Sequence, residues 1–167
     1  MTEIVMDMYH FHVWANRTIL KRLKEIPREV YTQELTSVFP SVSKVMPHIY
    51  ITDLCWYRIL SGENMSDAME HAHGLKEQIE ALELEELEVK FSELAESYKA
   101  LLGQLKHLDQ TIVVDNPYAG IRDTSYSEII LQTVNHATYH RGNITAMLRQ
   151  MGYPSVMTEY ALYWYSK

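Results

Sequence analysis

The stretch NHATYHRGN, residues 135–143, sets two histidines four positions apart inside a run of helical periodicity. At that spacing His136 and His140 stand one turn apart on the same face of a helix, where both imidazoles can reach a single metal ion. The spacing alone is a weak motif, and a metal site needs a further ligand. The surrounding sequence therefore has to decide what the pair does.

Apolar residues around the pair indicate the inward face of a bundle helix. They recur in steps of three and four, as on the buried stripe of an amphipathic helix, at Ile129, Ala137, Ile144, Met147 and Met151. Both imidazoles should thus face the core, where buried polar groups need hydrogen-bond partners or a metal. Two interpretations remain open: a metal site, or two core histidines bonded to tyrosine, threonine or water.

Three further long helices are predicted from the same kind of periodicity. The first covers about residues 3–26 and ends at Pro27, and the second covers about residues 42–62. A heptad seam of leucine and aromatic residues predicts the third over residues 84–108. The chain therefore reads as an all-α four-helix bundle.

The connections complete this prediction. Ser125 and Glu128 have the spacing of a capping box that opens the fourth helix. Residues 62–82 are polar and predict a long crossover that can include one short helical piece, so that the second and third helices can run parallel. Residues 111–125 predict a small hairpin or extended loop, and residues 158–165 a short C-terminal helix.

Length and composition exclude several classes of function. A length of 167 residues predicts one domain spanning residues 1–167, large enough to fold without disulfide or metal. The net charge of −7, with no cluster of lysine and arginine, argues against nucleic acid as partner. The single cysteine, Cys55, the absence of a signal-like N-terminus and the lack of an apolar run of about 20 residues predict a cytoplasmic protein without a membrane partner.

His48 is the candidate third ligand. It lies in the apolar stripe of the second helix, near its start, and Pro47 before it should either belong to the first turns or bend the helix. A long crossover can place the second helix beside the fourth. His48 could then meet His136 and His140, giving a three-histidine site with at least one open coordination position.

Several pieces of sequence together resemble the DinB/YfiT-like family of small four-helix bundles. They span nearly the whole chain: residues 14–16 (WAN), His48 with Trp56, residues 135–143, Leu148 with Gly152, and Thr158-Glu159. The resemblance implies metal-binding histidines at His48, His136 and His140. It also implies an up-down-down-up bundle that is often dimeric, so a homodimer is expected. Two departures are Asn143, where the family usually has glutamine, and Pro47.

The resemblance identifies the residues of the site, but it does not identify one reaction. The family includes thiol S-transferases that use bacillithiol or mycothiol, a mycothiol-dependent isomerase, and proteins described as metal-dependent hydrolases. An open three-histidine site suits Zn²⁺ first and Ni²⁺ second. In a transferase the metal would hold a low-molecular-weight thiol as thiolate, and in a hydrolase it would activate water with help from a general base.

Few carboxylates suit the role of that base. Asp53 follows His48 by five residues and is turned about 140° away on an ideal helix, and Glu128 belongs to the cap. Cys55, on a packed helix face, is a poor nucleophile candidate. We therefore expect a thiol-dependent S-transferase for small electrophiles, with Trp56 at the cofactor site excluding water. The alternatives are a metal-dependent hydrolase and a non-enzymatic, metal-binding or dimerising stress-response bundle.

Overall fold

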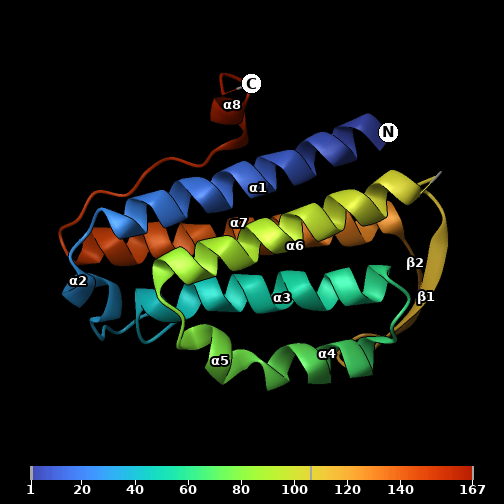
Figure 1. Cartoon of the computed structure of the whole chain (residues 1–167), viewed down its shortest axis with the longest axis horizontal. Helices are drawn as coiled ribbons and strands as arrows, with labels where there is room; N and C mark the ends of the chain where they lie inside the picture. Colours follow the sequence, from blue (N-terminus) through green and yellow to red (C-terminus); the bar gives the residue numbers. More distant parts are fainter. Residues whose placement is uncertain (1, 106, 167) are drawn as a thin grey trace.

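The computed structural model describes residues 2–105 and 107–166, which are mostly helical (Figure 1). Four long helices lie side by side, each in contact with two others: α1 (Thr2–Lys24), α3 (Val45–Leu60), α6 (Leu84–Gln104) and α7 (Tyr126–Gln150). Both α6 and α7 contact α1 and α3. The predicted helical class is confirmed, and among the described helices none is long and apolar enough to cross a membrane.

Shorter elements connect the long helices. The sequence between α1 and α3 contains α2 (Arg28–Thr32) and the 3-10 turn η1 (Val42–Lys44). Two short helices, α4 (Met65–Gly74) and α5 (Lys76–Glu80), fill the crossover between α3 and α6, where the sequence prediction allowed for one. The chain ends with α8 (Tyr160–Tyr163), which is shorter than predicted.

The predicted hairpin is present between α6 and α7. Strands β1 (Thr111–Asn116) and β2 (Gly120–Ser125) pair antiparallel, with Thr111 opposite Ser125. Gly120 begins β2 with φ of +91°, a conformation that residues with a side chain rarely adopt. Ser125 then caps α7, because its hydroxyl accepts from the Glu128 amide while the Glu128 carboxylate accepts from the Ser125 amide.

The third helix is shorter than its leucine seam predicted. It ends at Gln104, and Leu105 already has extended backbone angles. Leu108, which the seam placed on the helix, is nevertheless buried. The prediction of a helix through residue 108 was wrong because apolar spacing reports burial on one side of the chain, and a connection that packs on the core buries its leucine equally well.

Pro47 lies in the first turn of α3 and therefore interrupts no helical hydrogen bond. The helix starts at Val45, directly after η1, so Pro47 is its third residue. The first four amides of a helix have no intrahelical partner, and a missing N–H there costs little. Two positions were predicted for Pro47, in the first turns of the helix or at a bend, and the structure shows it in the first turn.

A chain of buried polar contacts links all four long helices. Arg141 of α7 donates to Oδ1 of Asn16 in α1 over 2.7 Å. The amide of Asn16 lies 3.1 Å from Nε2 of His12, which lies 2.9 Å from the Asp53 carboxylate of α3. Finally the hydroxyl of Tyr98 in α6 donates to the backbone carbonyl of Asp53 over 2.8 Å.

The charged groups in this buried network compensate each other. Burial raises the pKa of Asp53, whereas His12 and Arg141 lower it. Burial lowers the pKa of Arg141 to about 10, which leaves the guanidinium protonated at neutral pH. Since an isolated buried charge is costly, each charged group depends on the others. The network therefore defines how α1, α3 and α7 meet.

Candidate metal centre

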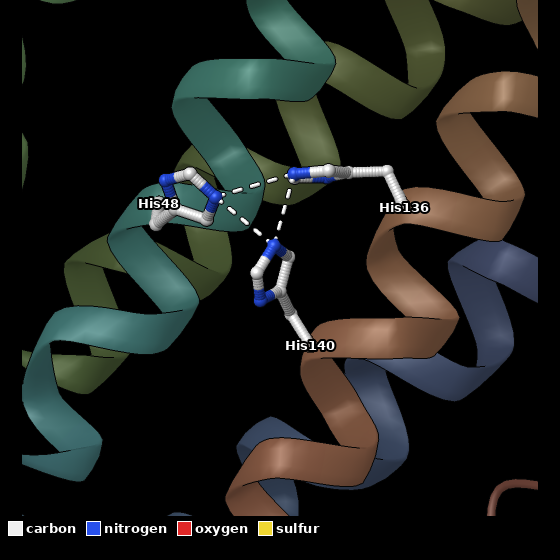
Figure 2. A group of neighbouring side chains, drawn as sticks. All are labelled: His48, His136 and His140. Atoms are coloured by element: carbon white, nitrogen blue, oxygen red, sulfur yellow. Dashed lines mark hydrogen bonds between the residues drawn. The ribbon is translucent and has the colours of Figure 1, made fainter. Parts of the chain in front are cut away.

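The three histidines singled out in the sequence come together between α3 and α7 (Figure 2). His48 projects from the beginning of α3, and His136 and His140 project from α7 one turn apart. Their Nε2 atoms point at one another. The distances between these atoms are 3.2 Å for His48 and His136, 3.1 Å for His48 and His140, and 3.1 Å for His136 and His140.

This triangle has the size that a metal ion requires. Nitrogen ligands at about 2.0–2.1 Å from a tetrahedral ion lie roughly 3.3–3.4 Å from one another. The three nitrogens, together with a fourth position outside the triangle, therefore match an ion bound by three imidazoles. Among the described residues, the group of side chains that could hold a metal consists of these three histidines and contains no carboxylate.

Hydrogen bonds among the three histidines cannot satisfy all three Nε2 atoms. Nδ1 of His140 lies 3.0 Å from Oδ1 of Asn143, an atom that only accepts, so we assign the His140 proton to Nδ1. The Nε2 atom of His140 then offers a lone pair. That lone pair can accept one N–H, from His48 or from His136, and the Nε2 atom of the remaining ring then has no hydrogen-bond partner in the triangle. The donor set thus fits a cation better than a cluster of neutral rings.

The electrostatics of the site keep the imidazoles neutral. Burial, followed by His140, Lys76 and His73, lowers the pKa of His48 to about 4. Burial, followed by the neighbouring histidines, lowers the pKa of His136 to about 3. Burial also lowers the pKa of His140, against the effect of its hydrogen bond with Asn143. Protons therefore compete weakly for the ring nitrogens at neutral pH, where the lone pairs are free to bind metal.

Two neighbouring residues, Asn143 and Phe39, orient the histidine rings. The sequence analysis did not assign this role to either of them. Asn143 fixes His140 through the Nδ1 hydrogen bond, and its position three residues later on the same helical face was a usable signal. The ring of Phe39 packs 5.2 Å from His48 and 5.3 Å from His140, between ring centroids. Phe39 lies in the connection before α3, and no local pattern predicts that contact. Nδ1 of His136 is buried and has no partner among the described residues, so packing holds that ring.

Trp56, the predicted cofactor-binding residue, lines a different hollow from His48. That hollow, of about 390 Å³, lies between α3, the hairpin and α7, and also includes Gln132, one turn before His136. His48 borders a second hollow with Phe39 and Thr52. The first hollow includes residues of both α3 and α7, whereas the second includes residues of α3 and of the connections around it. A role of Trp56 in binding a cofactor remains a prediction.

Asp53 and Cys55 are buried in α3, and neither belongs to the group of three histidines. The Asp53 carboxylate faces His12, in agreement with its predicted turn away from His48. Burial raises the pKa of the Cys55 thiol to about 11, which leaves it protonated and a weak nucleophile at neutral pH.

Comparison with known proteins agrees with the geometry. The sequence model of the DinB family matches residues 1–167. The chain is also 50% identical over 163 residues to "Protein DinB" of Bacillus subtilis (strain 168), an alignment that covers 98% of this chain and 95% of that protein. The chain belongs to the DinB family. Two sequence pieces that carried the resemblance, residues 14–16 and 135–143, are joined directly by the bond between Arg141 and Asn16.

Replacement of Asn143 tests whether the triangle is a metal site of this DinB-family protein. Asn143→Ala removes the acceptor that orients His140, and we expect metal affinity to fall about 10–100-fold, as is typical when such a partner of a ligand is lost. Competition titration with a chromophoric chelator measures the change. Asn135→Ala, an exposed position on the same helix next to His136, is the matched control and should bind as the parent does. Equal affinities for all three proteins would contradict the assignment.

Proposed function

We propose that this DinB-family protein is a metal-dependent S-transferase that joins a low-molecular-weight thiol to a small electrophile. The observation that carries the proposal is the triangle of three neutral imidazoles with no carboxylate in the group. Imidazole ligands suit Zn²⁺, our first choice, and Ni²⁺, the alternative. A cation held there would supply a Lewis acid that lowers the pKa of a thiol, so that the thiolate exists at neutral pH.

The chain's own residues set the conditions for this transfer. His48, His136 and His140 provide the lone pairs, Asn143 and Phe39 orient the rings, and burial limits access of water. In the transfer, the thiol loses its proton to solvent and its sulfur forms a bond to carbon. The leaving group departs with the electron pair of the bond that breaks. Cys55 is buried with a raised pKa, which supports a thiol that comes from outside the protein.

The hydrolase alternative rests on Glu80. This carboxylate borders the same hollow as His48 and could act as general base toward water. However, it is engaged by Lys44 over 2.6 Å and by Lys76 over 3.9 Å. Both carboxylate oxygens are thus already occupied by ammonium groups. This observation favours thiol transfer over hydrolysis.

We propose an up-down-down-up arrangement for the bundle and a cytoplasmic location. In Figure 1, α3 and α6 run in one direction and α1 and α7 in the other, which supports the topology. A cytoplasmic location fits the single reduced cysteine and the need for reduced low-molecular-weight thiols.

We also propose a homodimer. Large apolar side chains are exposed on α7 and in the C-terminal segment, at Leu131, Tyr139, Met157, Leu162 and Trp164. A groove of about 850 Å³ lies between α1, α7 and that segment. Leu131 and Met157 line this groove, and exposed apolar surface at a groove supports an interaction site. Light scattering should give twice the chain mass, and a monomer mass at every reachable concentration would contradict the proposal.

A thiol-transfer assay tests the proposed reaction. Protein loaded with Zn²⁺ or Ni²⁺ should accelerate conjugation of bacillithiol, mycothiol or glutathione to a halogenated model electrophile. His136→Ala should lose at least 100-fold of this rate, because it removes one metal ligand, whereas His10→Ala, at an exposed position of α1, should retain it.

The same proteins distinguish the alternatives. Failure to conjugate any thiol, together with ester or amide cleavage that depends on His136, would support the hydrolase. Absence of both activities across a broad panel would support the non-enzymatic, metal-binding bundle.

A further inference from the structure

A hollow beside the metal centre is bordered by cationic side chains. It measures about 340 Å³, within the range of small-molecule sites. Its residues come from four places in the chain: the connection before α3, α3 itself, the end of α4, and α5. The residues that matter for its charge and chemistry are Lys44, His48, Thr52, His73, Lys76 and Glu80.

One carboxylate holds two lysines at this hollow. Nζ of Lys44 lies 2.6 Å from one Glu80 oxygen, and Nζ of Lys76 lies 3.9 Å from the other. Glu80 is mostly buried, with 18% of its side chain exposed, whereas the lysines are exposed at 40% and 62%. Each ammonium has three N–H donors, so donors remain for a ligand after the contacts with Glu80.

The hollow is locally positive on an acidic protein. The whole chain carries a net charge of −7, yet here two lysines face one glutamate. Elsewhere lysines form simple pairs, such as Lys90 with Glu93 at 2.9 Å and Lys24 with Glu88 at 2.7 Å. Lys76 and His48 border the same hollow. The uncompensated charge therefore lies next to a candidate metal ligand.

We propose that this hollow binds an anionic group, a carboxylate or a phosphate, of the molecule whose reactive end reaches the three histidines. Lys44 and Lys76 donate to the anion, and Glu80 keeps both lysines in place. The inference rests on the proposed function, because it assigns a charge to the thiol or electrophile used there. It predicts substrates in which a short spacer separates the reactive atom from the acidic group.

The proposal is tested by binding of thiols to Co²⁺-loaded protein, followed by the absorption band that sulfur coordination produces. The probes are 3-mercaptopropionate, 2-mercaptoethylphosphonate and the neutral 2-mercaptoethanol. We expect at least one acidic thiol to bind about 10-fold more tightly than the neutral one, and the preferred one identifies the acidic group. High salt should reduce the preference, because it screens exposed charges.

Matched variants identify the source of the preference. Lys44→Gln combined with Lys76→Gln should abolish it, whereas Lys90→Gln, which removes a lysine of similar exposure from α6, should leave it unchanged. A preference that persists in the double variant would come from chelation by the ion itself and would overturn the proposal. Equal binding of acidic and neutral thiols by the parent would overturn it as well, while leaving thiol binding at the metal intact.

A second measurement tests the subsite without the metal. Malonate and inorganic phosphate are titrated into metal-free protein, and amide resonances around Lys44 and Lys76 are followed by NMR. Shifts that saturate in the parent and vanish in the double variant would support the anion site even if no thiol binds. The absence of shifts in the parent would overturn it, whatever the thiol assays show.

Discussion

The buried guanidinium of Arg141 joins α7 to α1 directly beside the candidate ligand His140. It donates to Asn16 and to the hydroxyl of Thr138, and it lies over the ring of Phe11. Loss of one partner from a buried, charged network typically costs about 3–5 kcal/mol. Alternative packings of α7 would have to leave this charge unpaired. The rotation of α7 that turns its two histidines toward α3 is thus fixed by a residue that binds no metal.

The same network extends to α3, which carries the remaining histidine. His12 connects Asn16 of α1 with Asp53 of α3, and its single Nε2 can donate to the carboxylate or accept from the amide, but cannot do both at once. Asp53 follows His48 by five residues, so anchoring its side chain toward α1 turns His48 toward a different side of α3. The buried polar chain and the histidine triangle therefore occupy different faces of α3, and the first helps to orient the second.

Helical periodicity predicted much of this arrangement, because it reports which side of a helix is buried. It gave the four long helices and the inward direction of His136 and His140, while the spacing of Ser125 and Glu128 gave the cap. It failed at Leu105 and Leu108, which continue the apolar spacing although the helix has already ended at Gln104. It also missed the second helix of the crossover. The apolar stripe of the second helix, together with the resemblance, brought His48 into the candidate site, and Trp56 was predicted to bind the cofactor there. The structure brings His48 to the other two histidines, whereas Trp56 lines a separate hollow.

Contacts that depend on tertiary packing could not be predicted from local sequence. Phe39 reaches two histidines from an irregular connection, and Glu80 holds lysines from two separate segments. The tryptophan of residues 14–16 packs on Phe11 and Tyr163, while Asn16, two positions later, bonds Arg141. Two residues of one short motif thus have separate roles, one in packing and one in hydrogen bonding.

The central claim is that His48, His136 and His140 bind one metal ion through Nε2. X-ray absorption spectroscopy on Zn²⁺-loaded protein tests it most directly. The account predicts one zinc per chain, with three imidazole nitrogens at about 2.0–2.1 Å and an oxygen or nitrogen ligand in the remaining position. His48→Ala should lose this signature and His10→Ala should keep it. Substoichiometric zinc, or a first shell without imidazole, would contradict the account.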